Sequence, residues 1–262
     1  MQFLVEVTHH RLPTTDLGYH LIEAVKYQNW YNNYKTDGHS VMITTKGDDY
    51  ATLITGSNFN CGENSIPVGT IEFVEYFMQN YTKKQFIKPI NIPDELNKMD
   101  FVQRRIWYGT KDDIVQLLNN YSHLFIKSNT RCKKFTDIIN KSDLPRIAED
   151  NYMISTIIET RSEWRVFVYK NRILDIRQYN GNWYDQPNIS FIERAVAAYK
   201  HCPPAYCLDV AILKDGESAV IEVHNFISCG LHGFEDYRYL PQMVVSAYKY
   251  EINKSTTHHL AP

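Results

Sequence analysis

The sequence contains little cysteine and no long hydrophobic run. Its 5 cysteines in 262 residues are an odd number and include no Cys-x-x-Cys pair, which argues against a disulfide framework or a structural zinc site and favours free thiols. No stretch of about 18 apolar residues is present, so no membrane-spanning helix is expected. The first residues, MQFLVEVTHH, lack the basic region of a signal peptide, and we therefore expect a cytoplasmic protein.

An excess of charge of one sign is also missing. The chain has 28 basic and 30 acidic side chains and a formal net charge of −2. Dedicated nucleic-acid binders usually carry a strong basic excess, so the sequence has no DNA-binding signature. A Gly-x-Gly-x-x-Gly motif is absent as well, which argues against a doubly wound dinucleotide-binding sheet.

Short apolar patterns with the periods of strands and helices alternate along the chain. The apolar spacing predicts a helix over 70–81, and Thr110 with Asp113 predicts the start of another helix. Ser190 with Glu193 predicts a third helix start. Strands are expected at 3–7, 123–127 and 152–159, and a hairpin at 163–170 and 172–179. This order predicts an α+β fold.

The stretch YCLDVAILKDGESAVIEVHNF, residues 206–226, reads as a hairpin that turns at Asp215 and Gly216. A two-residue turn would pair Asp209 with Glu222, whose Cβ atoms would lie about 4.5–5.5 Å apart. Two neighbouring carboxylates repel unless they are compensated, and Mg²⁺ is an economical partner for them. His224 would project from the same face as Glu222. The alternative is an exposed hairpin whose two acids face water.

Five motifs in one order resemble a known superfamily. PVGTIEFVE, FIK followed by KKFT, SEWRVF, LDV and IEVHNF are similar to a compact branch of the ATP-grasp proteins that is common in phages and bacteria. The branch has an α+β fold in which two subdomains grip ATP. In this superfamily an Asp and a Glu-x-Asn hold Mg²⁺ against the phosphates of ATP, which here correspond to LDV and IEVHNF.

The resemblance implies roles for individual residues. Those implied to contact phosphates, adenine or ribose are Arg104, Lys127, Lys133, Lys134, Ile158, Glu159 and Glu163. The implied metal ligands are Asp209, Glu222, His224 and Asn225, and the implied catalytic residues are Arg177 and Arg165. His224 stands where the family has an asparagine, which makes Mn²⁺ an alternative to Mg²⁺ because imidazole is a softer ligand.

Several of these side chains also have a plain structural interpretation. Lys127 could be a solvated lysine at a strand end, and Glu163 and Arg165 could belong to surface ion pairs. Arg177 could lie on the solvent face of its hairpin.

The resemblance also implies an activity and a domain order. The expected activity is that of an ATP-dependent carboxylate–amine ligase, in which a carboxylate takes the γ-phosphate and an amine then displaces phosphate. The substrates would be small carboxylates and amines, amino acids among them, or a macromolecular acceptor. The alternatives are a nucleotide-binding pseudo-enzyme and a modifier of a protein or nucleic acid. The expected parts are a small N-terminal α/β domain (1–92), a lobe with the phosphate loop (93–160) and a lobe with the metal site (161–262).

Overall fold

The computed structural model describes residues 2–31, 40–45, 65–82 and 86–254, whose contacts group them into two compact units. The first unit contains the described parts of 1–86, 203–205 and 225–262, and the second contains 87–202 and 206–224. The helices and strands are, in chain order, β1 (Gln2–Val7), α1 (Asp16–Tyr31), β2 (Ser40–Thr45), β3 (Ser65–Val68), α3 (Ile71–Tyr81), α4 (Met99–Val102), β4 (Ile106–Gly109), α5 (Lys111–Leu117), β5 (Leu124–Ser128), β6 (Thr136–Ile139), η1 (Lys141–Arg146), β7 (Tyr152–Ser155), β8 (Thr160–Tyr169), β9 (Arg172–Gly181), α6 (Ile189–Ala198), β10 (Ala205–Leu213), β11 (Ser218–Asn225), η2 (Tyr237–Tyr239) and α7 (Leu240–Asn253).

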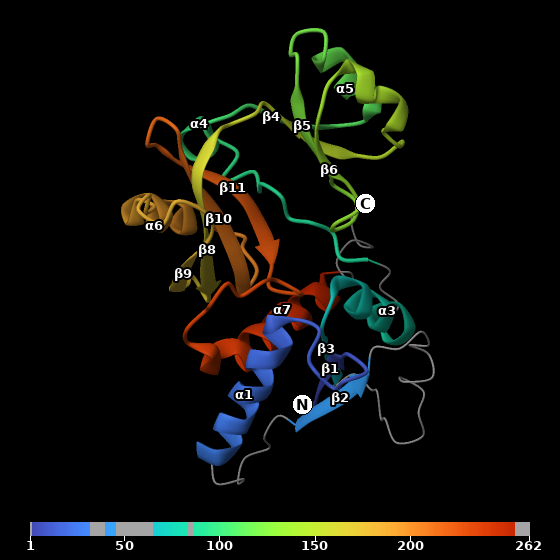
Figure 1. Cartoon of the computed structure of the whole chain (residues 1–262), viewed down its shortest axis with the longest axis vertical. Coiled ribbons are helices and arrows are strands. Elements are labelled where there is room, and N and C mark those ends of the chain that lie inside the picture. Colours follow the sequence, from blue (N-terminus) through green and yellow to red (C-terminus); the bar gives the residue numbers. More distant parts are fainter. Residues whose placement is uncertain (1, 32–39, 46–64, 83–85, 255–262) are drawn as a thin grey trace, which may run out of the picture. The chain divides into compact units, whose positions relative to one another are not determined.

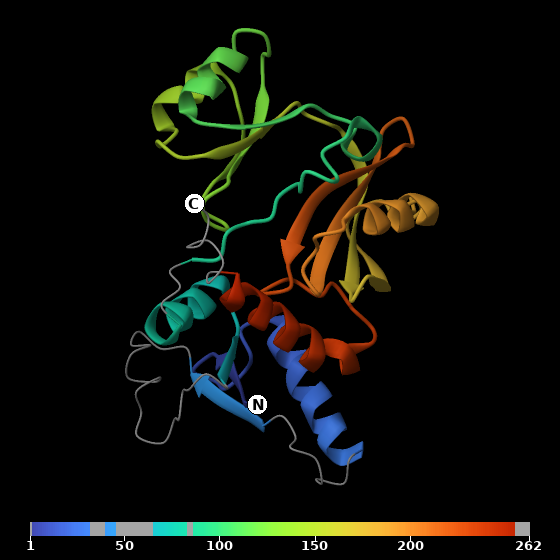
Figure 2. The ribbon, with the colours of Figure 1, turned by 180° about the vertical axis from the view of Figure 1, so that it is seen from behind.

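The first unit is built on a three-stranded parallel sheet in the order β2-β1-β3. Its central strand β1 is almost wholly buried, as expected for a parallel strand in the middle of a sheet. The predicted helix over 70–81 is α3, which begins after the N-cap Thr70, whose hydroxyl oxygen accepts a hydrogen bond from the backbone N–H of Phe73. Helices α1 and α7 lie side by side in this unit (Figure 2).

The second unit consists of two lobes, each with its own four-stranded sheet. In the first lobe the order is β4-β7-β5-β6 and every neighbouring pair is antiparallel. The apolar side of this sheet packs against α5 through residues such as Ile114, Ile126 and Ile154. The Thr110–Asp113 capping box that the sequence predicted is present at the start of α5.

The second lobe contains a sheet in the order β11-β10-β8-β9, with α6 over one face (Figure 1). Ile192 and Ala195 of α6 are fully buried in the same cluster as Val166 and Val210 of the sheet. The second unit thus has a mixed α+β architecture, as the sequence predicted. Among the described residues, no helix has both the length and the apolar character needed to span a membrane.

The predicted start of α6 was wrong by two residues. Asn188 is the N-cap, and its side-chain oxygen accepts a hydrogen bond from the N–H of Phe191 at 3.1 Å. Ser190 lies inside the helix and is exposed. Asn188 and Ser190 are both good capping residues, so the Glu at the third position after Ser190 was a misleading signal.

The predicted hairpin of β10 and β11 exists, but its turn is longer than expected. Leu213 N–H donates to the Glu217 carbonyl at 2.8 Å and Gly216 N–H donates to the Leu213 carbonyl at 2.9 Å, so the turn has three residues, 214–216. Gly216 has φ +90°, which a residue with a side chain adopts at a cost. The change of one residue in register moves Ala219 and Ile221 to the face of Ala211 and Leu213.

Candidate active site

A pocket of about 300 Å³ lies between the two lobes of the second unit. Phe125 of β5 and Ile138 of β6 line it from the first lobe. Its other lining residues come from the segment that joins the lobes and from the second lobe: Arg104, Ser155, Thr156, Ile157, Ile158, Thr160, Glu163, Tyr179, Asp209, Ile221 and Glu222. The pocket therefore has apolar walls and a set of ionisable groups at one side, which is the usual character of a small-molecule site.

The segment that joins β7 to β8 forms one apolar wall of this pocket. Ile157 and Ile158 line it, and Ile158 is one of the two residues implied for adenine. The other, Glu159, is exposed and forms an ion pair with the exposed Lys214. Glu159 does not line the pocket, so only its backbone neighbours Ile158 and Thr160 face the space.

Glu163, implied for ribose, is held at the pocket wall by its neighbours. The Thr160 hydroxyl donates to Glu163 Oε1 at 3.0 Å, and Tyr179 from the paired strand β9 also bonds this carboxylate. Burial raises the pKa of Tyr179 well above its ordinary value, and the charges of Asp209 and Glu163 raise it further. Tyr179 therefore stays a neutral hydroxyl that can donate.

The acids on β10 and β11 converge, although the turn register differs from the prediction. His224 Nε2 lies 2.9 Å from Asp209 Oδ2 and 3.3 Å from Glu222 Oε2. One nitrogen atom is thus within reach of both carboxylates. The structure brings together three of the four predicted metal ligands. The fourth, Asn225, is the last residue of β11 and belongs to the first unit.

Arg165 compensates the charge of Asp209. Its Nε donates to Oδ1 and its Nη2 to Oδ2, both at 2.8 Å, and the Asp209 side chain is only 4% exposed. Burial alone would raise the pKa of Asp209, but the hydrogen bonds from Arg165 and His224 lower it to about 2. Asp209 is therefore ionised, and both of its oxygens have a donor.

Two further cations implied for phosphates contact β11. Lys127 of β5 forms an ion pair with Glu222 across the two lobes. Arg104 is 6% exposed, and its guanidinium donates to the carbonyls of Val220 and Ile221, each at 2.9 Å. Burial lowers the pKa of Arg104 to about 10, so it remains charged at neutral pH. In this structure Arg104 holds the first lobe to the edge strand of the second.

The remaining basic residues lie around the loop after β5 and on β9. Lys134 pairs with Asp150, and the adjacent Lys133 is exposed. Arg177 of β9 donates through Nε to Asp175 Oδ2 at 2.7 Å. Their roles toward a nucleotide stay predictions.

The donor set suits a hard divalent cation, although nearby cations compete for it. The position of His224 Nε2 shows that one point can contact Asp209 and Glu222 together, and two carboxylates with phosphate oxygens are ordinary Mg²⁺ ligands. Within the described residues, no three His, Cys, Asp or Glu side chains are already arranged to hold a metal. A cation would have to replace the contacts of His224 and Lys127.

Sequence reasoning missed two residues of the site, Tyr179 and Asp150. Tyr179 is the last residue of the predicted strand 172–179, and its place beside Glu163 follows only from the β8–β9 register, which is irregular at this point. Asp150 is separated from the loop that it contacts by β6 and η1, so no local pattern indicated it.

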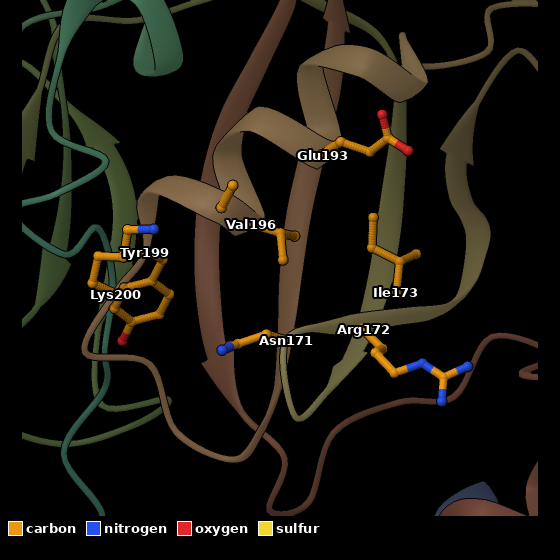
Figure 3. A pocket seen from close by; sticks show the side chains of 8 residues that line it. Asn171, Arg172, Ile173, Glu193, Val196, Tyr199 and Lys200 are labelled. Atoms are coloured by element: carbon orange, nitrogen blue, oxygen red, sulfur yellow. The ribbon is translucent and has the colours of Figure 1, made fainter.

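A second pocket, of about 580 Å³, lies between α6 and the β8–β9 turn (Figure 3). Ile173, Val196 and Tyr199 contribute apolar surface, and Arg172 and Lys200 lie at its rim. None of the predicted site residues lines it. The pocket between the lobes is therefore the better candidate for an active site.

Comparisons with known proteins agree with this site and fold. A D-cycloserine synthetase structure, DcsG, is similar with a TM-score of 0.60 at 9% identity, covering 95% of this chain and 99% of that one. The D-alanine–D-alanine ligase from Bacillus anthracis gives 0.52 at 12% identity, with 97% and 99% covered. The macrocyclase MdnC from Microcystis aeruginosa MRC, bound with precursor peptide MdnA, gives 0.50 at 10%, with 95% and 99% covered. No curated protein matches the chain by sequence.

The fold is thus that of the ATP-grasp proteins, in which two lobes enclose a pocket. Residues 101–241, more than half of the chain, match an ATP-grasp domain family, the second family of its clade. The chain belongs to this ATP-grasp family. The resemblance inferred from the five motifs is confirmed, and the identities of 9 to 12% to the solved structures show the fold alone.

Proposed function

We propose that the protein is an ATP-dependent carboxylate–amine ligase that forms an amide or peptide bond and releases ADP and phosphate. The observation that carries the proposal is the convergence, at one pocket, of an apolar adenine-sized wall, the acid Glu163, and the charged group of Lys127, Asp209 and Glu222. Family membership adds support. The acceptor would be a small carboxylate and amine, or a peptide.

The residues of the pocket have complementary tasks in this proposal. Ile157 and Ile158 would contact the base, and Glu163 would accept hydrogen bonds from the ribose hydroxyls. Phosphoryl transfer depends mainly on positioning and on neutralisation of charge. Lys127 would supply one positive charge once the nucleotide separates it from Glu222, and Arg177 would supply another after it leaves Asp175.

Asp209 and Glu222 would hold the divalent cation, with His224 or Asn225 beside them. When bound, such a cation neutralises phosphate oxygens and orients them. Arg165 keeps Asp209 ionised and fixed in direction, which is the role that its two hydrogen bonds support.

A nucleotide-binding module without turnover is the second candidate. Its specific support is the complete engagement of Asp209 by Arg165, together with the imidazole of His224 between the two acids. Both features reduce the number of carboxylate oxygens that are available to a cation.

Formation of ADP distinguishes the two candidates. The protein would be incubated with ATP, Mg²⁺ and a panel of carboxylates, each with and without amines, and ADP would be measured. The ligase predicts ADP only when both partners of a productive pair are present, and loss of that signal in Glu222→Gln and Lys127→Met. ATP binding without ADP formation for any pair would contradict the ligase and favour the binding module.

A further inference from the structure

One carboxylate from outside the loop between β5 and β6 holds this glycine-free loop in place. Asp150 precedes β7, and its side chain is 6% exposed. The Ser128 hydroxyl donates to Asp150 Oδ2 at 2.9 Å, and the Thr130 hydroxyl donates to Oδ1 at 2.8 Å. Lys134 Nζ lies 2.9 Å from Oδ2. The beginning and the end of the loop are therefore bonded to the same side chain.

Two other contacts fix the residue between these hydroxyls. The N–H of Asn129 donates to the Asn151 carbonyl at 2.8 Å, next to Asp150. The side-chain oxygen of Asn129 accepts a hydrogen bond from Asn91 Nδ2, also at 2.8 Å. Asn91 is fully buried, and its carbonyl accepts from Val223 of β11. The loop is thus tied to the strand that carries Glu222 and His224.

The two adjacent lysines of the loop have different surroundings. Lys134 is bound to Asp150, whereas the Lys133 side chain is exposed and has no ion-pair or hydrogen-bond partner among the described residues. Lys133 has φ +57°, in the left-handed region. A residue other than glycine costs about 1–2 kcal/mol there, so the neighbouring contacts of the loop must stabilise this conformation. They leave Lys133 as the loop lysine available to an anion.

We propose that Asp150 is a positioning residue that holds the phosphate loop, assigns Lys134 to anchoring, and leaves Lys133 to contact the nucleotide. The inference rests on the proposed function, because it takes the pocket beside Lys127 as the ATP site. The loop begins directly after β5, which carries Lys127, and ends at β6, which contributes Ile138 to the pocket. A loop that is ordered before ATP arrives loses less conformational freedom on binding.

The charge state of Asp150 is consistent with this role. Burial raises its pKa, but the bonds from Lys134, Thr130 and Ser128 outweigh burial and keep the pKa below its usual value. The ionised carboxylate accepts all of these bonds at neutral pH.

Hydrogen exchange of the full chain without nucleotide tests the anchor. Asp150→Asn is expected to speed amide exchange in residues 129–134 about tenfold or more, because it removes a charged acceptor. Lys134→Met, which removes one half-exposed cation, should speed it about threefold. Lys133→Met, one residue away, should leave exchange unchanged. Unchanged exchange in both Asp150→Asn and Lys134→Met would overturn the proposal.

Calorimetry with ATP and Mg²⁺ tests the assignment of the two lysines. Lys133→Met should weaken ATP binding about tenfold, with no change in exchange, as expected for loss of a direct contact. Lys134→Met should weaken it less, and only together with faster exchange. Weaker binding in Lys134→Met than in Lys133→Met, at unchanged exchange, would overturn the division of roles. If the wild type does not bind ATP, the proposed function fails, while the exchange result still decides whether Asp150 holds the loop.

Discussion

At the scale of single residues, the candidate site consists of acids that are compensated by neighbouring cations. Asp209 is paired with Arg165, and Glu222 with Lys127. The first pair is buried and bidentate, whereas the second is partly exposed and joins the two lobes. The buried pair should therefore serve stability and orientation, and the second pair should open when a nucleotide binds.

Removal of Arg165 alone should be strongly destabilising. Arg165→Met leaves Asp209 buried without its partner, and we expect a loss of about 3–5 kcal/mol in the free energy of unfolding. Urea denaturation measures it. The double variant Arg165→Met, Asp209→Leu removes both charges and should recover most of the loss. A single variant within about 1 kcal/mol of the wild type would contradict a buried, structural ion pair.

The same pair predicts a pH dependence of stability. Because the folded-state pKa of Asp209 is about 2 and its ordinary value is 3.8, the ionised carboxylate stabilises the folded state above about pH 4. This contribution, of about 2 kcal/mol, is lost as the pH falls from about 4 to about 2. The double variant lacks it, so the stability difference from the wild type should change over that range. A difference that is independent of pH would contradict the lowered pKa.

At the scale of helices and strands, regular patterns were predictable and turn geometry was not. Alternating apolar residues located β8, β9, β10 and β11, and helical spacing located α3. An Asp-Gly pair fits a two-residue turn and also the last two positions of a three-residue turn, so sequence alone could not fix the register at Gly216. The contact of Arg165 with Asp209 depends on β8 lying beside β10, which no local pattern specifies.

The start of α6 provides a matched pair of variants. Asn188→Ala removes the cap of the Phe191 N–H and should cost about 1 kcal/mol of stability, measured by denaturant unfolding. Ser190→Ala lies two residues later at an exposed helical position and should change stability by less than about 0.5 kcal/mol. A larger loss in Ser190→Ala than in Asn188→Ala would restore the cap that the sequence first indicated.

At the scale of the whole molecule, the chain consists of two units, and the candidate site lies wholly in the second. The family match over 101–241 includes both of its sheets. The predicted domain boundaries at 92/93 and 160/161 stay predictions. The contacts place the described residues from Asn225 onward with the N-terminal unit, and residues 87–92 with the second unit. A sequence read from one end to the other does not reveal such a return of the chain.

The central claim is that the pocket between the two lobes binds ATP with a divalent cation. Thermal unfolding with ATP or ADP, each with Mg²⁺, Mn²⁺ or EDTA, tests it most directly on the wild type and on Glu222→Gln. A nucleotide at about 100 times its dissociation constant should stabilise the wild type by roughly 2.7 kcal/mol, in a metal-dependent way that Glu222→Gln loses. No stabilisation of the wild type under any of these conditions would contradict the claim.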